Sequence, residues 1–181
     1  MIIDESALKV PEKPYLSEEY LRRLMRTINS LVDKIAEMLA VYSPTSYTLT
    51  TGTLTAGDVT DVQEFGDGNA LDIGEVTGVP GYDVSFQFEK IKPFSKAKTH
   101  LIYNGDGDHV VEFQMYNYKT SNWDNLTSFT LSAVHQFIQC PIDDYTKFRD
   151  VDGNASLRLY HVTSGNAAHN ISIDYVALSG V

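Results

Sequence analysis

The stretch that decides the fold is "HNISIDYVALSGV", residues 169–181. Its side chains alternate in a way that predicts a β-strand, in which successive residues point to opposite faces. One face would carry Ile171, Ile173, Tyr175 and Ala177, and the other would carry Ser172, Asp174, Val176 and Leu178. The carboxylate of Asp174 interrupts this apolar run, and burying it is costly unless something pairs with it. Four roles are open for Asp174: a metal ligand, a catalytic group, half of an ion pair, or a marker of register.

Short strands are predicted throughout the preceding sequence, back to about residue 47. "YDVSFQFEKI" (82–91) places Val84, Phe86 and Phe88 inward and polar residues outward. "THLIYNG" (99–105) and "HVVEFQMYNY" (109–118) overlap or flank the turn "NGDGD", whose glycines and aspartates are typical of a hairpin loop. No stretch after Val41 has a helical period. These features predict a mainly β protein, with residues 47–181 forming a two-sheet β-sandwich of the jelly-roll type.

An amphipathic helix is predicted before the sandwich, over residues 17–41, with Ser17 as its N-cap. Its apolar residues are spaced 3, 4, 3, 4, 3, as in a heptad seam. The seam consists of Leu21, Leu24, Ile28, Leu31, Ile35 and Met38. Such a stripe either packs on its own domain or joins copies of the chain. We favour a homo-oligomer, a trimer or a dimer, with residues 1–16 as an extended arm and 42–46 as a linker.

Composition argues against nucleic-acid binding, membrane spans and cysteine-based sites. The net charge is −10 and the pI is about 4.8, which disfavours binding to nucleic acid through phosphate neutralisation. No apolar run approaches the roughly 18 residues of a membrane span. Cys140 is the only cysteine, so neither an intrachain disulfide nor a thiolate metal cluster is possible. The N-terminus lacks the pattern of a secretory signal, and we expect a chain made in a reducing compartment.

A resemblance covers residues 47–181. It rests on "DGNALDIGEVTGVPGYDVSFQFEKI", "LIYNGDGDHVVEFQMYNYKTSNWDNL" and "DGNASLRLYHVTSGNAAHNISIDYVAL" in this order and spacing. The pattern resembles the galactose-binding-like jelly rolls of carbohydrate-binding modules, and more closely the versions carried by structural proteins of tailed phages. A heptad helix before a β head is also similar to the plan of trimeric virion fibres and decoration proteins.

The resemblance implies a structural or accessory virion protein, such as a capsid decoration, head fibre, collar or tail component. It would be assembled in the host cytoplasm and dock on other virion proteins through residues 1–16. The alternative is a carbohydrate-binding module that recognises cell-surface glycans.

The resemblance also implies a structural calcium ion at Asp174, since relatives use the aspartate of this strand. Their other ligands are acidic residues of the first strand, where this chain has only hydroxyls in "YTLTTGTL" (47–54). Glu75 is the candidate substitute for them, because calcium takes six to eight oxygen ligands. The competing hypothesis pairs Asp174 with Arg158 or with a backbone turn.

Trp123 is the only tryptophan, and it lies in a polar segment that we interpret as a connection between strands. With Tyr116, Tyr118 and Asn122 it forms a candidate glycan-binding group, since an aromatic plane beside polar groups suits a sugar. The alternative is that Trp123 caps the open end of the core. The five histidines are scattered and form no known catalytic or metal-binding motif, and we expect no enzymatic activity.

Overall fold

The computed structural model describes residues 18–180, so the predicted arm over residues 1–16 lies outside the described residues. Its contacts divide the chain into two units, residues 1–36 and 37–181. The boundary falls inside helix α1 (Glu18–Leu39).

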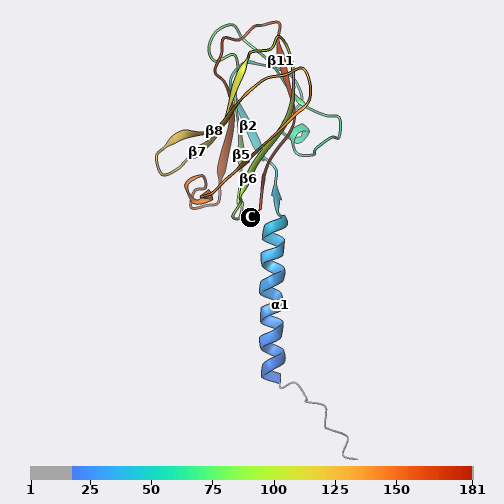
Figure 1. Cartoon of the computed structure of the whole chain (residues 1–181), viewed down its shortest axis with the longest axis vertical. Coiled ribbons are helices and arrows are strands. Elements are labelled where there is room, and N and C mark those ends of the chain that lie inside the picture. The colour runs from blue at the N-terminus through green and yellow to red at the C-terminus, as the bar shows by residue number, and fades with distance from the viewer. Residues whose placement is uncertain (1–17, 181) are drawn as a thin grey trace, which may run out of the picture. The chain divides into compact units, whose positions relative to one another are not determined.

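The β domain is a sandwich of two antiparallel sheets (Figure 1). The six-stranded sheet has the order β3 (Thr53–Ala56), β4 (Leu71–Gly74), β11 (Asn170–Ser179), β6 (Lys96–Asn104) and β9 (Gln136–Pro141), with β1 (Val41–Tyr42) also paired to β11. The five-stranded sheet has the order β2 (Ser46–Thr51), β5 (Asp83–Phe88), β10 (Ala155–His161), β7 (Val110–Asn117) and β8 (Asn122–Thr130). Two short 3-10 helices, η2 (Val59–Val62) and η3 (Tyr145–Lys147), lie in the connections. The predicted mainly β jelly-roll sandwich is confirmed.

The core forms between the sheets because each strand alternates apolar and polar residues. Val84, Phe86 and Phe88 of β5 are fully buried, as the alternation predicts. They meet other fully buried side chains from both sheets, including Leu71, Ile73, Leu101, Val111, Phe113, Met115, Leu157 and Leu159. Each such side chain contributes about 1.5–3 kcal/mol through burial. Polar residues between these positions point away from the core.

The closing strand β11 contains a bulge that changes its outward face. The register with β6 runs regularly to Ile173, then shifts before Tyr175. Consequently Ile171 and Ile173 point into the core from one side of the bulge, and Val176 and Leu178 do so from the other. The predicted faces are right up to Ile173 and wrong beyond it, because an inserted residue inverts the alternation.

The helix α1 presents an unburied apolar stripe. The helix ends at Leu39, two residues before the predicted end. Strand β1 follows where the linker was expected to start, and it pairs with β11. Nine apolar side chains of the helix are between 42% and 75% exposed: Leu21, Leu24, Met25, Ile28, Leu31, Val32, Ile35, Met38 and Leu39. All six seam residues are among them. Within residues 18–180, no helix is long and apolar enough to cross a membrane.

Candidate functional site

The outward face of the five-stranded sheet gathers aromatic and polar side chains from four strands. They occupy positions that alternate with the core residues, so they point away from the other sheet. We call this surface the aromatic face and define it by Asp83, Gln114, Tyr116, Trp123, Arg158 and Tyr160. The register places Tyr160 opposite Asp83 and Arg158 opposite Gln114. Tyr116 lies opposite Trp123, so the face is continuous across β5, β10, β7 and β8.

Three of the four predicted glycan-binding residues come together here. The ring centroids of Tyr116 and Trp123 are 5.4 Å apart and those of Tyr116 and Tyr118 are 5.0 Å apart, both edge to face. Asn122 is exposed, and its side chain donates a hydrogen bond to the carbonyl of Thr120. The predicted polar connection around Trp123 is wrong, because the turn lies at residues 118–121 and Trp123 belongs to β8. Trp123 lies on the outer face of the sheet and does not cap the core.

Arg158 is held at the centre of the aromatic face. Its Nε and Nη2 atoms donate to the two carboxylate oxygens of Asp83, both at 2.6 Å, and Nη1 donates to Gln114 Oε1 at 3.3 Å. The guanidinium lies 4.2 Å from the ring centroid of Tyr160 and 5.2 Å from that of Trp123. A planar cation fixed by a bidentate pair and by aromatic rings has little freedom to move. The pair neutralises its own two charges, and Glu112, which accepts a hydrogen bond from Gln114 Nε2 at 2.6 Å, adds a negative charge beside it.

A hollow adjoins the aromatic face at one end. It has a volume of about 500 Å³, and its lining includes Gln87 and Ser156 of the same sheet face, together with Tyr118 and Asn154. Tyr118 also borders a second hollow of about 530 Å³ beside η3. Burial raises the pKa of the Tyr118 hydroxyl, which is therefore neutral near pH 7 and able to donate and accept hydrogen bonds. The two hollows have the volume of ordinary small-molecule sites.

The partner of Asp174 is His100. Asp174 Oδ1 lies 2.6 Å from His100 Nδ1 on the outer side of the six-stranded sheet. The predicted ion pair with Arg158 is wrong, because Arg158 belongs to the other sheet and is bound to Asp83. Rings surround this pair and form a second aromatic cluster: Phe65, His100, His135, Phe137 and Tyr175.

The structure does not bring Glu75 to Asp174. The amide of Glu75 donates to the carbonyl of His169, which is five residues before Asp174 along β11, or about 16 Å in an extended strand. A calcium ion shared by these two carboxylates is therefore wrong, and a calcium ion held by Asp174 without Glu75 stays a prediction. Glu75 is instead buried beside Tyr103 and three histidines, a group that the scattered sequence positions did not indicate. Burial lowers the pKa of His161 in this group.

Three members of the aromatic face, Arg158, Tyr160 and Asp83, were not predicted as site residues. The signal was present in "SLRLYHV", where inward Leu157 and Leu159 imply outward Arg158 and Tyr160. Which strands would lie beside them was not readable, because strand order is set by the fold.

A comparison with protein-family models and with curated protein sequences finds no match. Among solved structures, a family 29 carbohydrate-binding module is 15% identical, with 74% of this chain and 88% of that chain covered and a TM-score of 0.47. The family 11 module from Clostridium thermocellum, in complex with a beta-1,3-1,4-mixed-linked tetrasaccharide, is 13% identical, with coverages of 80% and 89% and a TM-score of 0.46. A CBM4 structure is 11% identical, with coverages of 81% and 98% and a TM-score of 0.49. No residue's role is carried from these modules to this chain.

Proposed function

We propose that the β domain binds a glycan on the aromatic face, without catalysing a reaction. The observation that carries this proposal is the meeting of Tyr116, Trp123 and Tyr160 with the fixed Arg158–Asp83 pair on one sheet surface. A sugar ring has an apolar face and a polar edge, so it suits an aromatic plane beside preset hydrogen-bonding groups. The groups are held by one another before any ligand arrives, which reduces the ordering cost of binding.

The charges favour a neutral glycan. Arg158 is the only cation among the six residues that define the face, and Asp83 neutralises it. The chain as a whole carries a net charge of −10, which repels anionic polymers at low salt. A hollow lined by Gln87, Ser156 and Tyr118 extends the face along the strands. Its lining also includes three acidic residues and one basic residue, Glu89, Asp150, Asp152 and Lys90. We therefore expect an oligosaccharide of several units and not a monosaccharide.

Self-association through α1 would strengthen weak binding by each head. The exposed seam of the helix supports a homo-oligomer, since exposed apolar stripes of this length are typical of interaction surfaces. Joining heads raises their effective concentration at a surface that carries many copies of the ligand. A display role on a virion, as a trimer or a dimer docked through residues 1–16, stays a prediction.

The test is binding of the full chain to an array of neutral and acidic glycans, followed by titration calorimetry with the best ligand. We compare wild type, Trp123→Ala and a matched control, Phe137→Ala, which removes an exposed ring from the second aromatic cluster. We expect Trp123→Ala to weaken binding at least tenfold and Phe137→Ala to leave it unchanged. Circular dichroism and thermal midpoints establish that each variant is folded.

Two results would overturn the proposal. One is a folded wild-type protein that binds no glycan on the array at high density. The other is loss of binding in Phe137→Ala with retention in Trp123→Ala, which would place the site on the six-stranded sheet.

A further inference from the structure

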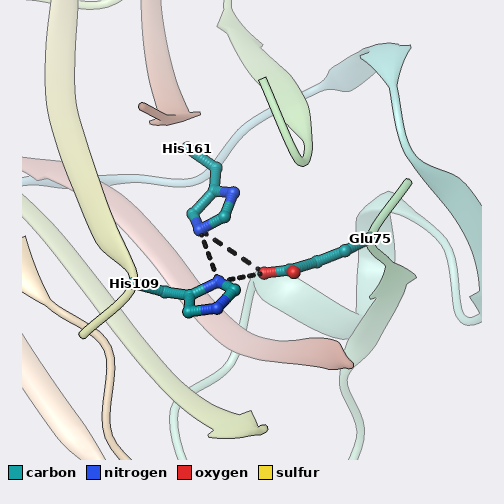
Figure 2. Close-up of side chains that lie close together, drawn as sticks. All are labelled: Glu75, His109 and His161. Carbon is teal, nitrogen blue, oxygen red and sulfur yellow. Dashed lines mark hydrogen bonds and ion pairs between the residues drawn. The ribbon is translucent and has the colours of Figure 1, made fainter. Parts of the chain in front are cut away.

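Four segments that are far apart in the sequence bring ionisable side chains to one end of the sandwich. Glu75 follows β4, His109 precedes β7, His161 ends β10 and His169 precedes β11. Glu75 and His161 are fully buried, and the side chain of His109 is 15% exposed. Figure 2 shows Glu75, His109 and His161 pointing toward one another. The group therefore joins both sheets at a place where burying charge is costly.

The three atoms at the centre are spaced like metal ligands. His109 Nδ1 lies 3.3 Å and His161 Nε2 lies 3.5 Å from Glu75 Oε1, and the two nitrogens are 2.9 Å apart. Ligands of tetrahedral zinc, each about 2.0–2.1 Å from the metal, stand about 3.3 Å from one another. Two of the three spacings match this value, and the third needs to lengthen by about 0.4 Å to match it.

Protons alone do not complete this network. Four contacts of 2.8–2.9 Å join Tyr103 Oη to Glu75 Oε1, Tyr103 Oη to His109 Nδ1, Tyr103 Oη to His169 Nδ1, and His109 Nδ1 to His161 Nε2. The hydroxyl has one proton and can donate to Glu75, while His169 can donate to the hydroxyl. A single proton on His109 Nδ1 then serves Tyr103 or His161 but not both. With neutral imidazoles, the proton on His109 Nδ1 can go to Tyr103, and His161 Nε2 can accept a hydrogen bond from Thr163 Oγ1 at 3.0 Å. The 2.9 Å contact between His109 Nδ1 and His161 Nε2 is then left without a proton, and a cation bound by both nitrogens would take the place of that proton.

The rings are also held in place. The ring of His161 stacks on Tyr82, with centroids 5.1 Å apart and planes 8° apart. A Cβ atom at Gly81 would lie only 2.1 Å from His161 Nδ1, so this position requires glycine for the ring to fit. The second carboxylate oxygen of Glu75 accepts a hydrogen bond from the amide of Asn166 at 2.8 Å. These neighbours orient the His161 ring and the Glu75 carboxylate by packing and by a backbone hydrogen bond, while His161 Nδ1 has no hydrogen-bond partner within residues 18–180.

We propose that Glu75 Oε1, His109 Nδ1 and His161 Nε2 bind one divalent transition metal ion of the zinc class. Two imidazoles and one carboxylate suit zinc and not calcium, which takes six to eight oxygens. Tyr103 Oη lies 2.9 Å from both Glu75 Oε1 and His109 Nδ1, and His169 Nδ1 lies 2.8 Å from the same hydroxyl. The ion would connect β4 of one sheet to β7 and β10 of the other, and so stabilise the end of the sandwich. This site is independent of the proposed glycan site.

The test begins with full chain that has been treated with a chelator and then titrated with ZnCl₂. We expect one zinc ion per chain, and at a 100-fold excess over the dissociation constant a rise of about 5–10 °C in the thermal midpoint. His109→Ala should weaken binding at least 100-fold. His135→Ala is the matched control, because it removes an exposed imidazole of the second aromatic cluster, and it should bind zinc as wild type does.

Crystals soaked in ZnCl₂ give a measurement that does not depend on any variant. Anomalous scattering at the zinc edge should show one peak about 2 Å from each of the three named atoms. The proposal is overturned by an unchanged thermal midpoint with no zinc bound, by equal loss of binding in both variants, or by a peak at another position. If the cluster holds an additional proton in place of a metal ion, the thermal midpoint stays unchanged and no zinc binds.

Discussion

Replacing Arg158 by methionine tests whether the aromatic face is held rigid by a buried ion pair. Methionine keeps much of the length of the side chain but removes both hydrogen bonds of 2.6 Å to Asp83. The Asp83 side chain is only 7% exposed, so its carboxylate would be left buried without a cation. Removing one partner of a buried pair costs about 3–5 kcal/mol. Because the Arg158 side chain keeps 18% exposure, we expect a loss of about 3 kcal/mol, the low end of that range.

The measurement is urea unfolding of the full chain, followed by circular dichroism at one protein concentration. With a slope of about 2 kcal/mol/M, the midpoint should fall by about 1.5 M. The double variant Arg158→Met/Asp83→Asn is the matched control, because it removes the unpaired charge together with its partner. The asparagine introduced at position 83 stays buried and polar without its former partner, so we expect the double variant to lose about 1–2 kcal/mol relative to wild type. The single variant should be less stable than the double variant. A loss below about 1 kcal/mol in the single variant would refute the reasoning, since the pair would then resemble a surface pair.

Three further predictions concern other parts of the chain. Ile28→Asp puts a charge in the exposed seam of α1 and should lower the mass of the oligomer measured by sedimentation equilibrium. A mass equal to that of wild type would contradict self-association through this seam. Gly81→Ala places a Cβ atom 2.1 Å from His161 Nδ1 and should lower the free energy of unfolding in urea by at least about 2 kcal/mol. Its control is Gly107→Ala, whose Cβ would meet no heavy atom within 4 Å and which should cost less than about 1 kcal/mol. Burial raises the pKa of the Cys140 thiol, so less thiolate is present at pH 8 in the native protein than in the unfolded chain. Labelling by a thiol reagent should therefore be at least about tenfold slower in native protein than in urea.

Much of the fold was readable from local patterns. The alternation in residues 82–91 correctly predicted that Val84, Phe86 and Phe88 of β5 point into the core. The 3, 4, 3, 4, 3 spacing correctly predicted a helix with one apolar stripe. The grouping of Tyr116, Tyr118 and Trp123 was predicted because they lie on either side of one hairpin turn. In each case the interacting residues are neighbours in the sequence, so periodicity is enough to place them.

The features that were missed all depend on how distant strands align. Arg158 was one candidate partner of Asp174, but the two residues belong to different sheets. Each has a partner from a strand of its own sheet. The bulge in β11 inverted the predicted outward face after Ile173. A bulge leaves no mark in the alternation itself, because its position is set by pairing with β6.

The sequence by itself determined the fold class, the apolar stripe of the helix and, outside the bulge of β11, the residues that face the core. These features follow from periods of two and of 3.6 residues along one segment. Only the tertiary structure decided which polar residues meet. Glu75, His109, His161 and His169 come from four segments, and their ionisable atoms converge because the strand order and register bring one end of each segment to the same place. The aromatic face was decided in the same way. Register is a long-range property, set by the packing of two whole sheets, and no local pattern contains it.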